Sequence, residues 1–443
     1  MCEAVGRKIN RNFEYVMQIN VSRIKDFLLL VLLFVLPWQT RLIYQTAYLG
    51  ENFWEFGSLS LYGVEILLGV TVLFFLVDKI RSDFHSLLIK HFNKKRLAII
   101  LASIFGIFLL YLLTSAHCAI TWQYLNWFIY GLCLIFITLE SQLSLKKLLL
   151  AVWAGGFLQG VLAIWQFFNQ YIPANKWLGM AVQDPRQLGV AVVEFGDERW
   201  LRAYGSFGWP NSLGIYLAVV FLLGIILIEI ENIKKYRIML LVGQLFIIIG
   251  LFFSFARGAW LAGVVGLCIF GIKKYKDRIF WQQIGVYAVT TLMLLIIFKP
   301  LVISRFDLQN RLEKNSISQR IDQGVEFKKI FYSNYLVGTG PGNYTAVLHN
   351  LFPQYFAYDL KPVHNIYLLF VAEFGLFGLF LLVIFLFRNI KLVYLYFAPL
   401  VALLVAGLFD HWSMSTFTGL TFLCLMIGLS VKYFAIDTKV SPE

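Results

Sequence analysis

Residues 210–229 read PNSLGIYLAVVFLLGIILIE, and their only charged residue is Glu229 at the very end. A helix that crosses the hydrocarbon core of a bilayer needs about 20 consecutive, mainly apolar residues. Pro210 stands in the first turn, where a helix tolerates proline. The stretch therefore predicts a helix that spans a membrane.

Eleven further runs of similar length and character lie on both sides of this stretch. We therefore predict an all-α, polytopic membrane protein with about twelve transmembrane helices. The other runs lie near 27–44, 58–77, 97–115, 122–139, 147–168, 238–254, 257–272, 283–303, 365–387, 391–409 and 412–433. Those at 238–272 and 391–433 are nearly continuous, so the number of spans in each stays open.

The composition of the whole chain indicates that lipid is its main solvent. Of the 443 residues, 59% are hydrophobic and 14% are charged, and the mean hydropathy is +0.73. Soluble domains are about half apolar and about a quarter charged. The five cysteines are scattered without a C-x-x-C motif, so neither a disulfide framework nor a zinc site is predicted. No repeat or linker divides residues 1–443, which we predict to form a single transmembrane domain.

The distribution of basic residues predicts the orientation. The net charge of +13 is best explained by loops beside anionic lipid, so no nucleic acid partner is predicted. Lysine and arginine are concentrated in the N-terminal segment, in every second loop and in the C-terminal tail. These loops are 78–96, 140–147, 230–237, 272–282 and 388–391. Because basic loops stay on the cytoplasmic side, both termini are predicted to be cytoplasmic.

Two long loops on the opposite, outer side carry most of the remaining positive charge. They cover residues 169–209 and 304–364. Positive charge outside runs against the usual topology rule, which indicates another use for it, although loops of about 60 residues begin to escape that rule. A connector this long in a compact protein is usually functional or disordered.

The longer outer loop has a helical pattern of its own. Ser316 and Gln319 fit a capping box, S-x-x-Q. The apolar residues that follow have near-helical spacing: Ile317, Ile321, Val325 and Ile330. We predict an amphipathic helix that lies over the outer membrane surface.

Several common catalytic motifs are absent from the sequence. It contains no G-x-x-x-x-G-K-[ST], no H-E-x-x-H, no G-x-S-x-G and no D-x-D. Neither a nucleotide, a metal nor another cofactor is therefore predicted. A cytoplasmic nucleotide-sugar enzyme would also need an inner domain, and the inner loops are too short to form one.

Three arginines are candidates for binding an anion at the outer surface. Arg257 lies in F-S-F-A-R-G-A-W-L, between two apolar runs, Arg202 precedes A-Y-G-S-F-G-W-P-N, and Arg320 ends S-I-S-Q-R. The planar guanidinium can hold two phosphate oxygens and keeps its charge in a partly dry site. Arg257 and Arg202 could instead be interfacial anchors with the charged end in water, and Arg320 could lie on the solvated face of the predicted surface helix.

Two further segments carry candidate site residues. His364 opens a predicted helix in K-P-V-H-N-I-Y-L, where Asn365 could satisfy open backbone groups at the helix start. Gly340 lies in the outer segment G-T-G-P-G-N-Y, whose backbone N–H groups could face an anion. A capped interfacial histidine and a plain tight turn are the alternatives. Asp410 and His411 are interpreted as a local pair that holds an outer turn.

Three segments together resemble the O-antigen ligase and polymerase superfamily. They are S-F-A-R-G-A-W-L at 254–261, G-T-G-P-G-N-Y at 338–344, and H-N-I-Y-L at 364–368 followed by Gly375, ten intervening residues after His364. The basic loop that contains Arg320 fits the same pattern. The resemblance is strongest between residues 200 and 410, and before residue 150 it is limited to hydropathy.

The resemblance implies a GT-C-type membrane glycosyltransferase in a bacterial inner membrane. The donor would be an undecaprenyl-pyrophosphate-linked glycan and the acceptor a hydroxyl of a glycolipid or glycan, with inverting transfer that needs no metal. It implies His364 as the catalytic base and Arg257 as a pyrophosphate ligand. Arg202 and Arg320 would be further phosphate or sugar contacts, and Asn365 and Gly340 further binding residues.

A transporter or flippase for a lipid-linked saccharide is the alternative function. Twelve transmembrane helices with both termini in the cytoplasm are also a common arrangement in transporters, although transporters more often show repeated halves. Glu65 and Glu373 fall inside predicted spans, where carboxylates usually face a cavity or a partner.

Overall fold

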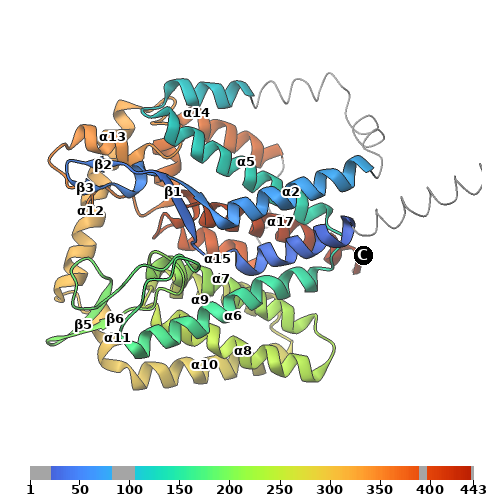
Figure 1. The fold of residues 1–443 in the computed structure, drawn as a ribbon. Helices are drawn as coiled ribbons and strands as arrows, with labels where there is room; N and C mark the ends of the chain where they lie inside the picture. Colours follow the sequence, from blue (N-terminus) through green and yellow to red (C-terminus); the bar gives the residue numbers. More distant parts are fainter. Residues whose placement is uncertain (1–20, 82–104, 389–396, 441–443) are drawn as a thin grey trace, which may run out of the picture.

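The computed structural model describes residues 21–81, 105–388 and 397–440. Figure 1 shows a bundle of helices that run mostly along one common direction. The short strands, the long loops and the crosswise helix α12 gather at one end, on the left of the view. The opposite ends of several helices lie at the right.

Helices make up most of the described residues. They are residues 21–35, α2 (Gly63–Arg81), residues 105–114, α5 (Cys118–Glu140), α6 (Leu145–Asn169), α7 (Pro210–Glu229), α8 (Lys234–Phe253), α9 (Arg257–Lys273), α10 (Arg278–Ile297), α11 (Lys299–Phe306), α12 (Arg311–Ser333), α13 (Tyr344–Leu351), α14 (Ile366–Arg388), α15 (Ala398–Ala406), α16 (Trp412–Ser415) and α17 (Phe417–Val440), with a 3₁₀ turn at Glu55–Gly57.

Seven of the described helices are long and apolar enough to cross a membrane. They are α5, α6, α7, α8, α10, α14 and the Phe417–Ala435 part of α17. Each corresponds to one of the predicted spans, and α7 matches the predicted range 210–229 at both ends. A mostly helical membrane protein is therefore confirmed.

The other five predicted spans also contain helix, but with less length or more charge. Near 257–272, α9 has 17 residues. Near 58–77, α2 carries Glu65, Asp78 and Lys79. The span predicted at 97–115 is described only from Phe105 and that at 391–409 only from 397, because the remainder lies outside the described residues. The total of twelve spans stays a prediction.

The first predicted span has the wrong boundary. Its helix ends at residue 35, and the predicted range 27–44 runs on into strand β1 (Arg41–Gln45). The described residues also form three small antiparallel two-stranded sheets that the sequence analysis did not predict. They pair β1 with β4 (Leu59–Tyr62), β2 (Tyr48–Leu49) with β3 (Asn52–Phe53), and β5 (Val192–Phe195) with β6 (Glu198–Leu201).

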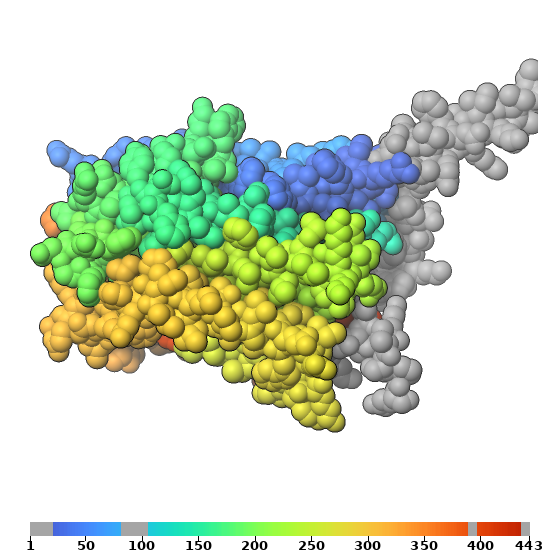
Figure 2. All heavy atoms as spheres, turned by 90° about the horizontal axis from the view of Figure 1, so that it is seen from below, coloured from blue at the N-terminus to red at the C-terminus, as the bar shows by residue number. Residues whose placement is uncertain are grey.

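The core of the bundle is α7. Nearly all of its residues are buried, because α6, α8, α9 and α15 pack around it. By contrast, α10 lies at the edge with most of its apolar side chains exposed. Figure 2 shows α8 and α10 along one long side of the molecule, with α11 and α12 at its left end. Such an exposed apolar side suits contact with lipid.

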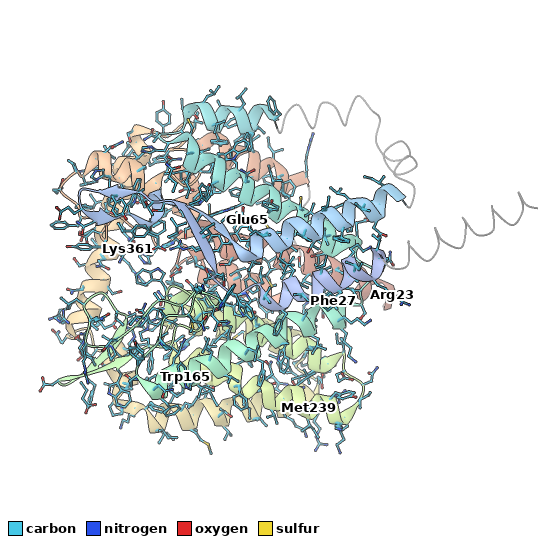
Figure 3. The ribbon with its side chains drawn as sticks, viewed as in Figure 1. Arg23, Phe27, Glu65, Trp165, Met239 and Lys361 are labelled. Atoms are coloured by element: carbon cyan, nitrogen blue, oxygen red, sulfur yellow. The ribbon has the colours of Figure 1, made fainter. Side chains whose placement is uncertain are left out.

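The alternation of basic loops is reflected in the three-dimensional arrangement. Helix ends that were predicted to be cytoplasmic are joined by ion pairs at one end of the bundle. These pairs are Lys25–Asp78 at 2.6 Å, Lys79–Glu140 at 2.6 Å, Lys146–Glu231 at 2.9 Å and Lys274–Glu229 at 2.7 Å. In Figure 3, Arg23 marks this end and Lys361 the opposite end. The side of the membrane that each end faces stays a prediction.

The predicted helix in the long outer loop is present as α12, but its start was wrong. The helix begins at Arg311, and the side chain of Asn310 caps it by accepting a hydrogen bond from the Leu312 N–H. Ser316 therefore lies inside the helix and does not cap it. The predicted apolar residues Ile317, Ile321 and Val325 are exposed.

Candidate functional site

A cavity of about 350 Å³ opens at the end of the bundle that carries the short strands and α12, the end predicted to be the outer one. Its walls come from the segment before β5, the start of α7, the start of α9, α11, α12 and the turn after α15. Four arginines line it, and they come from widely separated parts of the chain: Arg202, Arg257, Arg305 and Arg320. Asp410 lines the same cavity. Three of the four arginines were predicted from sequence.

The loop before α7 holds Arg202 in place. Its Nε donates to the Ser254 carbonyl at 2.8 Å, and an Nη atom donates to Asn211 Oδ1 at 2.7 Å. The Asn211 amide in turn donates to Asp410 Oδ2 at 3.3 Å. Because Asn211 lies in the first turn of α7, the buried core helix fixes the position of this guanidinium.

A single buried carboxylate joins two of the arginines. Glu313, near the start of α12, is 1% exposed. It forms an ion pair with Arg257 at 2.5 Å and another, shorter one with Arg305. Arg257 also donates to the Arg305 carbonyl at 2.7 Å. The first residue of α9, the end of α11 and the start of α12 are therefore held together by charge.

Arg320 differs from the other three arginines. Its side chain is exposed and forms no hydrogen bond or ion pair with any residue in the part of the chain that the structure describes. It lines the cavity from two turns further along α12 than Glu313. Its guanidinium is therefore available to a ligand.

The cavity carries more positive than negative charge. Burial and the nearby Arg305 lower the pKa of Arg202 to about 9. Burial also lowers the pKa of Arg305 to about 10, although Glu313 opposes the change. The pKa of Arg320 is lowered too, because its guanidinium, although exposed, is partly shielded from water on the cavity side and lies near Arg257. Arg202 and Arg305 remain protonated at these pKa values near pH 7, and a bound anion would relieve the repulsion among the guanidinium groups.

His364 lies beside this cavity and is not one of its lining residues. Its ring packs against that of His411 with 5.1 Å between centroids, and Asp410, which lines the cavity, directly precedes His411. Burial and then His411 lower the pKa of His364 to about 4, and Asp410 partly opposes them. The ring is therefore neutral near pH 7 and can accept a proton.

Gln323 of α12 contacts His364 at two points. Its Oε1 accepts a hydrogen bond from the backbone N–H of His364 at 3.1 Å and lies 3.0 Å from the ring Nδ1. Glu313, Ser316, Arg320 and Gln323 are spaced so that they share one face of α12. This face extends over about 15 Å, at about 1.5 Å per residue. The helix therefore connects the arginine cluster to the histidine.

The structure does not bring Asn365 or Gly340 to the cavity lining. Asn365 Oδ1 accepts from the backbone N–H groups of Tyr367 and Leu368, which confirms the predicted capping role. The N–H of Gly340 donates to the Glu373 carbonyl at 3.0 Å and is not free for an anion. Its φ of +88° and its contact with Ser115 explain the glycine.

The two carboxylates that fall inside predicted spans have hydrogen-bond partners in the protein. Glu65 accepts from the Tyr62 N–H at 3.3 Å, and Glu373 accepts from the backbone N–H groups of Gly342 and Tyr344. Asp410 accepts from the Trp412 N–H at 2.9 Å within its turn, whereas the His411 ring nitrogen Nδ1 lies 2.6 Å from Ser415 Oγ, so the two residues hold the turn through other partners and not as the predicted pair. Within the described ranges, no group of three or more His, Cys, Asp or Glu side chains could hold a metal ion.

Sequence reasoning missed Arg305, Glu313 and Gln323 as parts of the site. Arg305 was one of the unexplained outer cations, so its charge was a usable signal. Glu313 and Gln323 lie seven residues before and three residues after Arg320, which is the spacing of one helix face. With the helix start placed at Arg311, this spacing would have identified both.

A comparison with known protein families identifies a segment that includes several residues of the cavity lining. Residues 242–383 match the family model described as O-antigen ligase. This segment includes Arg257, Arg305, Arg320 and His364, whereas Arg202 and Asp410 lie outside it. No curated protein matches the chain significantly. This match, over about a third of the chain, supports the resemblance to the O-antigen ligase and polymerase superfamily.

Proposed function

We propose that this protein transfers a glycan from undecaprenyl pyrophosphate to a hydroxyl group of a glycolipid or glycan acceptor, at the outer face of a bacterial inner membrane. The family match supports glycan transfer of the ligase or polymerase type in general. The single observation that carries the specific proposal is the cavity lined by four arginines. Such a set of fixed cations suits the two negatively charged phosphate groups of a diphosphate.

Arg257 and Arg320 are the proposed ligands of the diphosphate. Arg257 begins α9 and lines the cavity, and Arg320 faces it from α12 with a free guanidinium. Negative charge grows on the diphosphate oxygens as the bond to the sugar breaks. Guanidinium groups already in place stabilise that charge without rearranging. Arg202 and Arg305, held by protein groups, supply further fixed positive charge.

The proposed step is a direct displacement at the anomeric carbon. The acceptor oxygen forms a bond to this carbon while the bond from the carbon to the diphosphate oxygen breaks. The bonding pair leaves with the lipid diphosphate. The acceptor hydroxyl loses its proton to the neutral ring of His364. A positioned general base contributes typically about 10²–10⁴-fold. One displacement inverts the anomeric configuration, and we expect chelators to leave the rate unchanged.

Two substitutions test the proposed roles. We expect Arg257→Ala and His364→Ala each to abolish glycan transfer in a reconstituted assay, while the protein still inserts in the membrane. Arg186→Ala is a matched control, because Arg186 is exposed in the other outer loop and does not line the cavity. Full activity in both site variants would refute the assignment.

The same assay separates the proposal from lipid or saccharide transport. Purified protein in vesicles should form a new glycosidic bond without net movement of the donor across the bilayer. Movement without a new bond would favour a flippase. Deletion followed by analysis of surface glycans then separates the two transferase types: loss of attachment with normal chain length indicates a ligase, and attachment of single repeats a polymerase.

A further inference from the structure

The contact between Gln323 and His364 determines which ring nitrogen carries the hydrogen. The backbone N–H of His364 can only donate, so the Gln323 atom 3.1 Å from it must be the amide oxygen. The same oxygen lies 3.0 Å from Nδ1 of the ring. An oxygen cannot donate, so Nδ1 has to donate to it. In the neutral imidazole, the other nitrogen, Nε2, then has the free lone pair.

We propose that Gln323 is a positioning residue that holds His364 in the Nδ1–H tautomer, with Nε2 presented as the proton acceptor. Gln323 is 9% exposed, so water competes little for its oxygen. The tautomer follows from the contacts alone. The catalytic use of Nε2 rests on the proposed function. A second hydrogen bond of this kind commonly sets the orientation and basicity of a functional histidine.

The placement of Gln323 on α12 gives this contact a further consequence. The same helix face carries Glu313, which pairs with Arg257 and Arg305, and Arg320, which lines the cavity. A displacement of α12 would therefore alter the anion ligands and the histidine together. We infer that this outer helix keeps the base and the cations in a fixed relation.

The tautomer can be measured without any substrate. The probe is the nitrogen NMR spectrum of the full-length protein with labelled histidine in lipid nanodiscs. The His364 signals are those lost in His364→Gln. We expect a protonated Nδ1 and an unprotonated Nε2, and Gln323→Leu should lose this single state. A wild-type ring with the hydrogen on Nε2 would overturn the proposal.

Kinetics test the positioning role. We expect Gln323→Leu to lower kcat by about tenfold or more with little change in KM for the donor, because a positioned base contributes on that scale. Gln323→Glu keeps the acceptor oxygen and should retain most activity. Gln319→Leu is the matched control, because Gln319 is an exposed glutamine one turn earlier on α12.

The pH profile adds a readout that a purely structural role would not change. The groups whose charges act on His364 are His411, Asp410, Arg320 and Lys361, and none of them changes in Gln323→Glu. The new carboxylate would stabilise the imidazolium, so the acidic limb should move to higher pH. A wild-type kcat in Gln323→Leu together with an unmoved limb in Gln323→Glu would overturn the proposal. If neither His364→Ala nor Gln323→Leu reduces transfer while the NMR spectrum shows the expected tautomer, only the proposed function is refuted.

Discussion

Glu313 determines how two of the cavity arginines are arranged. Its buried carboxylate contacts both Arg257 and Arg305, and each of these also donates to a backbone carbonyl. Without the carboxylate, two neighbouring guanidinium groups would repel each other in a partly dry site. A buried charge that loses its partner is costly, whereas an exposed one is not.

We therefore expect Glu313→Gln to lower the free energy of unfolding by about 1–3 kcal/mol, the usual cost of a buried polar group left without its partner. Added inorganic pyrophosphate should restore part of the loss, because an anion that binds the folded state stabilises it. Thermal unfolding in detergent measures both effects. Glu51→Gln, at an exposed turn, should change neither. A wild-type unfolding temperature for Glu313→Gln would contradict the prediction.

The protonation of His364 predicts the pH dependence of the reaction. Burial, then His411, lowers the pKa of this ring to about 4, so the ring is neutral above that pH and charged below it. A proton acceptor must be neutral to work. The transfer rate should therefore stay level from about pH 8 to about pH 5 and fall as the pH drops through about 4. A rate that halves near pH 6.5 would indicate an unperturbed histidine instead.

At the scale of elements, the break in α14 fixes the Gly-rich outer segment. Gly375 has φ 63° and ψ −170° inside this helix, a conformation open essentially only to glycine. The freed backbone groups pair with the segment before α13: Leu376 N–H donates to Tyr335 and Phe377 N–H to Leu336. The Thr339 and Gly340 N–H groups donate to α14 carbonyls in return. Backbone hydrogen bonds therefore hold the segment G-T-G-P-G-N-Y to the break in α14, which gives it a structural role.

Gly375→Ala should accordingly destabilise the protein by about 1–3 kcal/mol or more. The added Cβ would lie 2.4 Å from the Leu336 carbonyl oxygen, and the backbone angles would be strained as well. Gly285→Ala in α10 is the control, because its Cβ meets nothing within 4 Å and alanine favours helix. Thermal unfolding of both variants measures the difference. Equal unfolding temperatures would contradict the prediction.

The whole molecule has two chemically distinct ends. One end is held by lysine–carboxylate pairs between neighbouring helices, and Lys432 of α17 adds hydrogen bonds to the Thr138 and Ser141 carbonyls. The other end carries the arginine cavity and the crosswise helix α12 (Figure 1). We propose that positive charge sets the topology at one end and binds an anion at the other.

Membrane-impermeant thiol reagents test this orientation in intact cells. In a variant whose five native cysteines are replaced by serine, Gln187→Cys in the outer loop should be labelled and Lys276→Cys between α9 and α10 should not. Both positions are exposed, so access differs only through the membrane. Permeabilised cells, in which both should react, are the control. The reverse pattern of labelling would invert the predicted topology.

Local sequence patterns were enough to predict most of the helices and the chemistry available to single residues. Apolar runs near the length of a bilayer and alternating basic loops depend only on local composition, so α7 could be predicted to the residue. Arg202, Arg257, Arg320 and His364 could be selected because their residue types suit the chemistry. The small sheets could not be predicted, since strands of two to five residues are too short to show a clear periodic signal.

Only the tertiary structure decided which of these residues meet. The cavity depends on contacts between residues far apart in the chain, as in Arg257–Glu313 and Gln323–His364. Such contacts arise from how α9, α11 and α12 pack, and no local pattern contains that information. Packing also turned the Gly340 N–H towards α14 instead of a ligand. The residue type determines which chemistry a side chain can perform, and packing determines which groups it contacts.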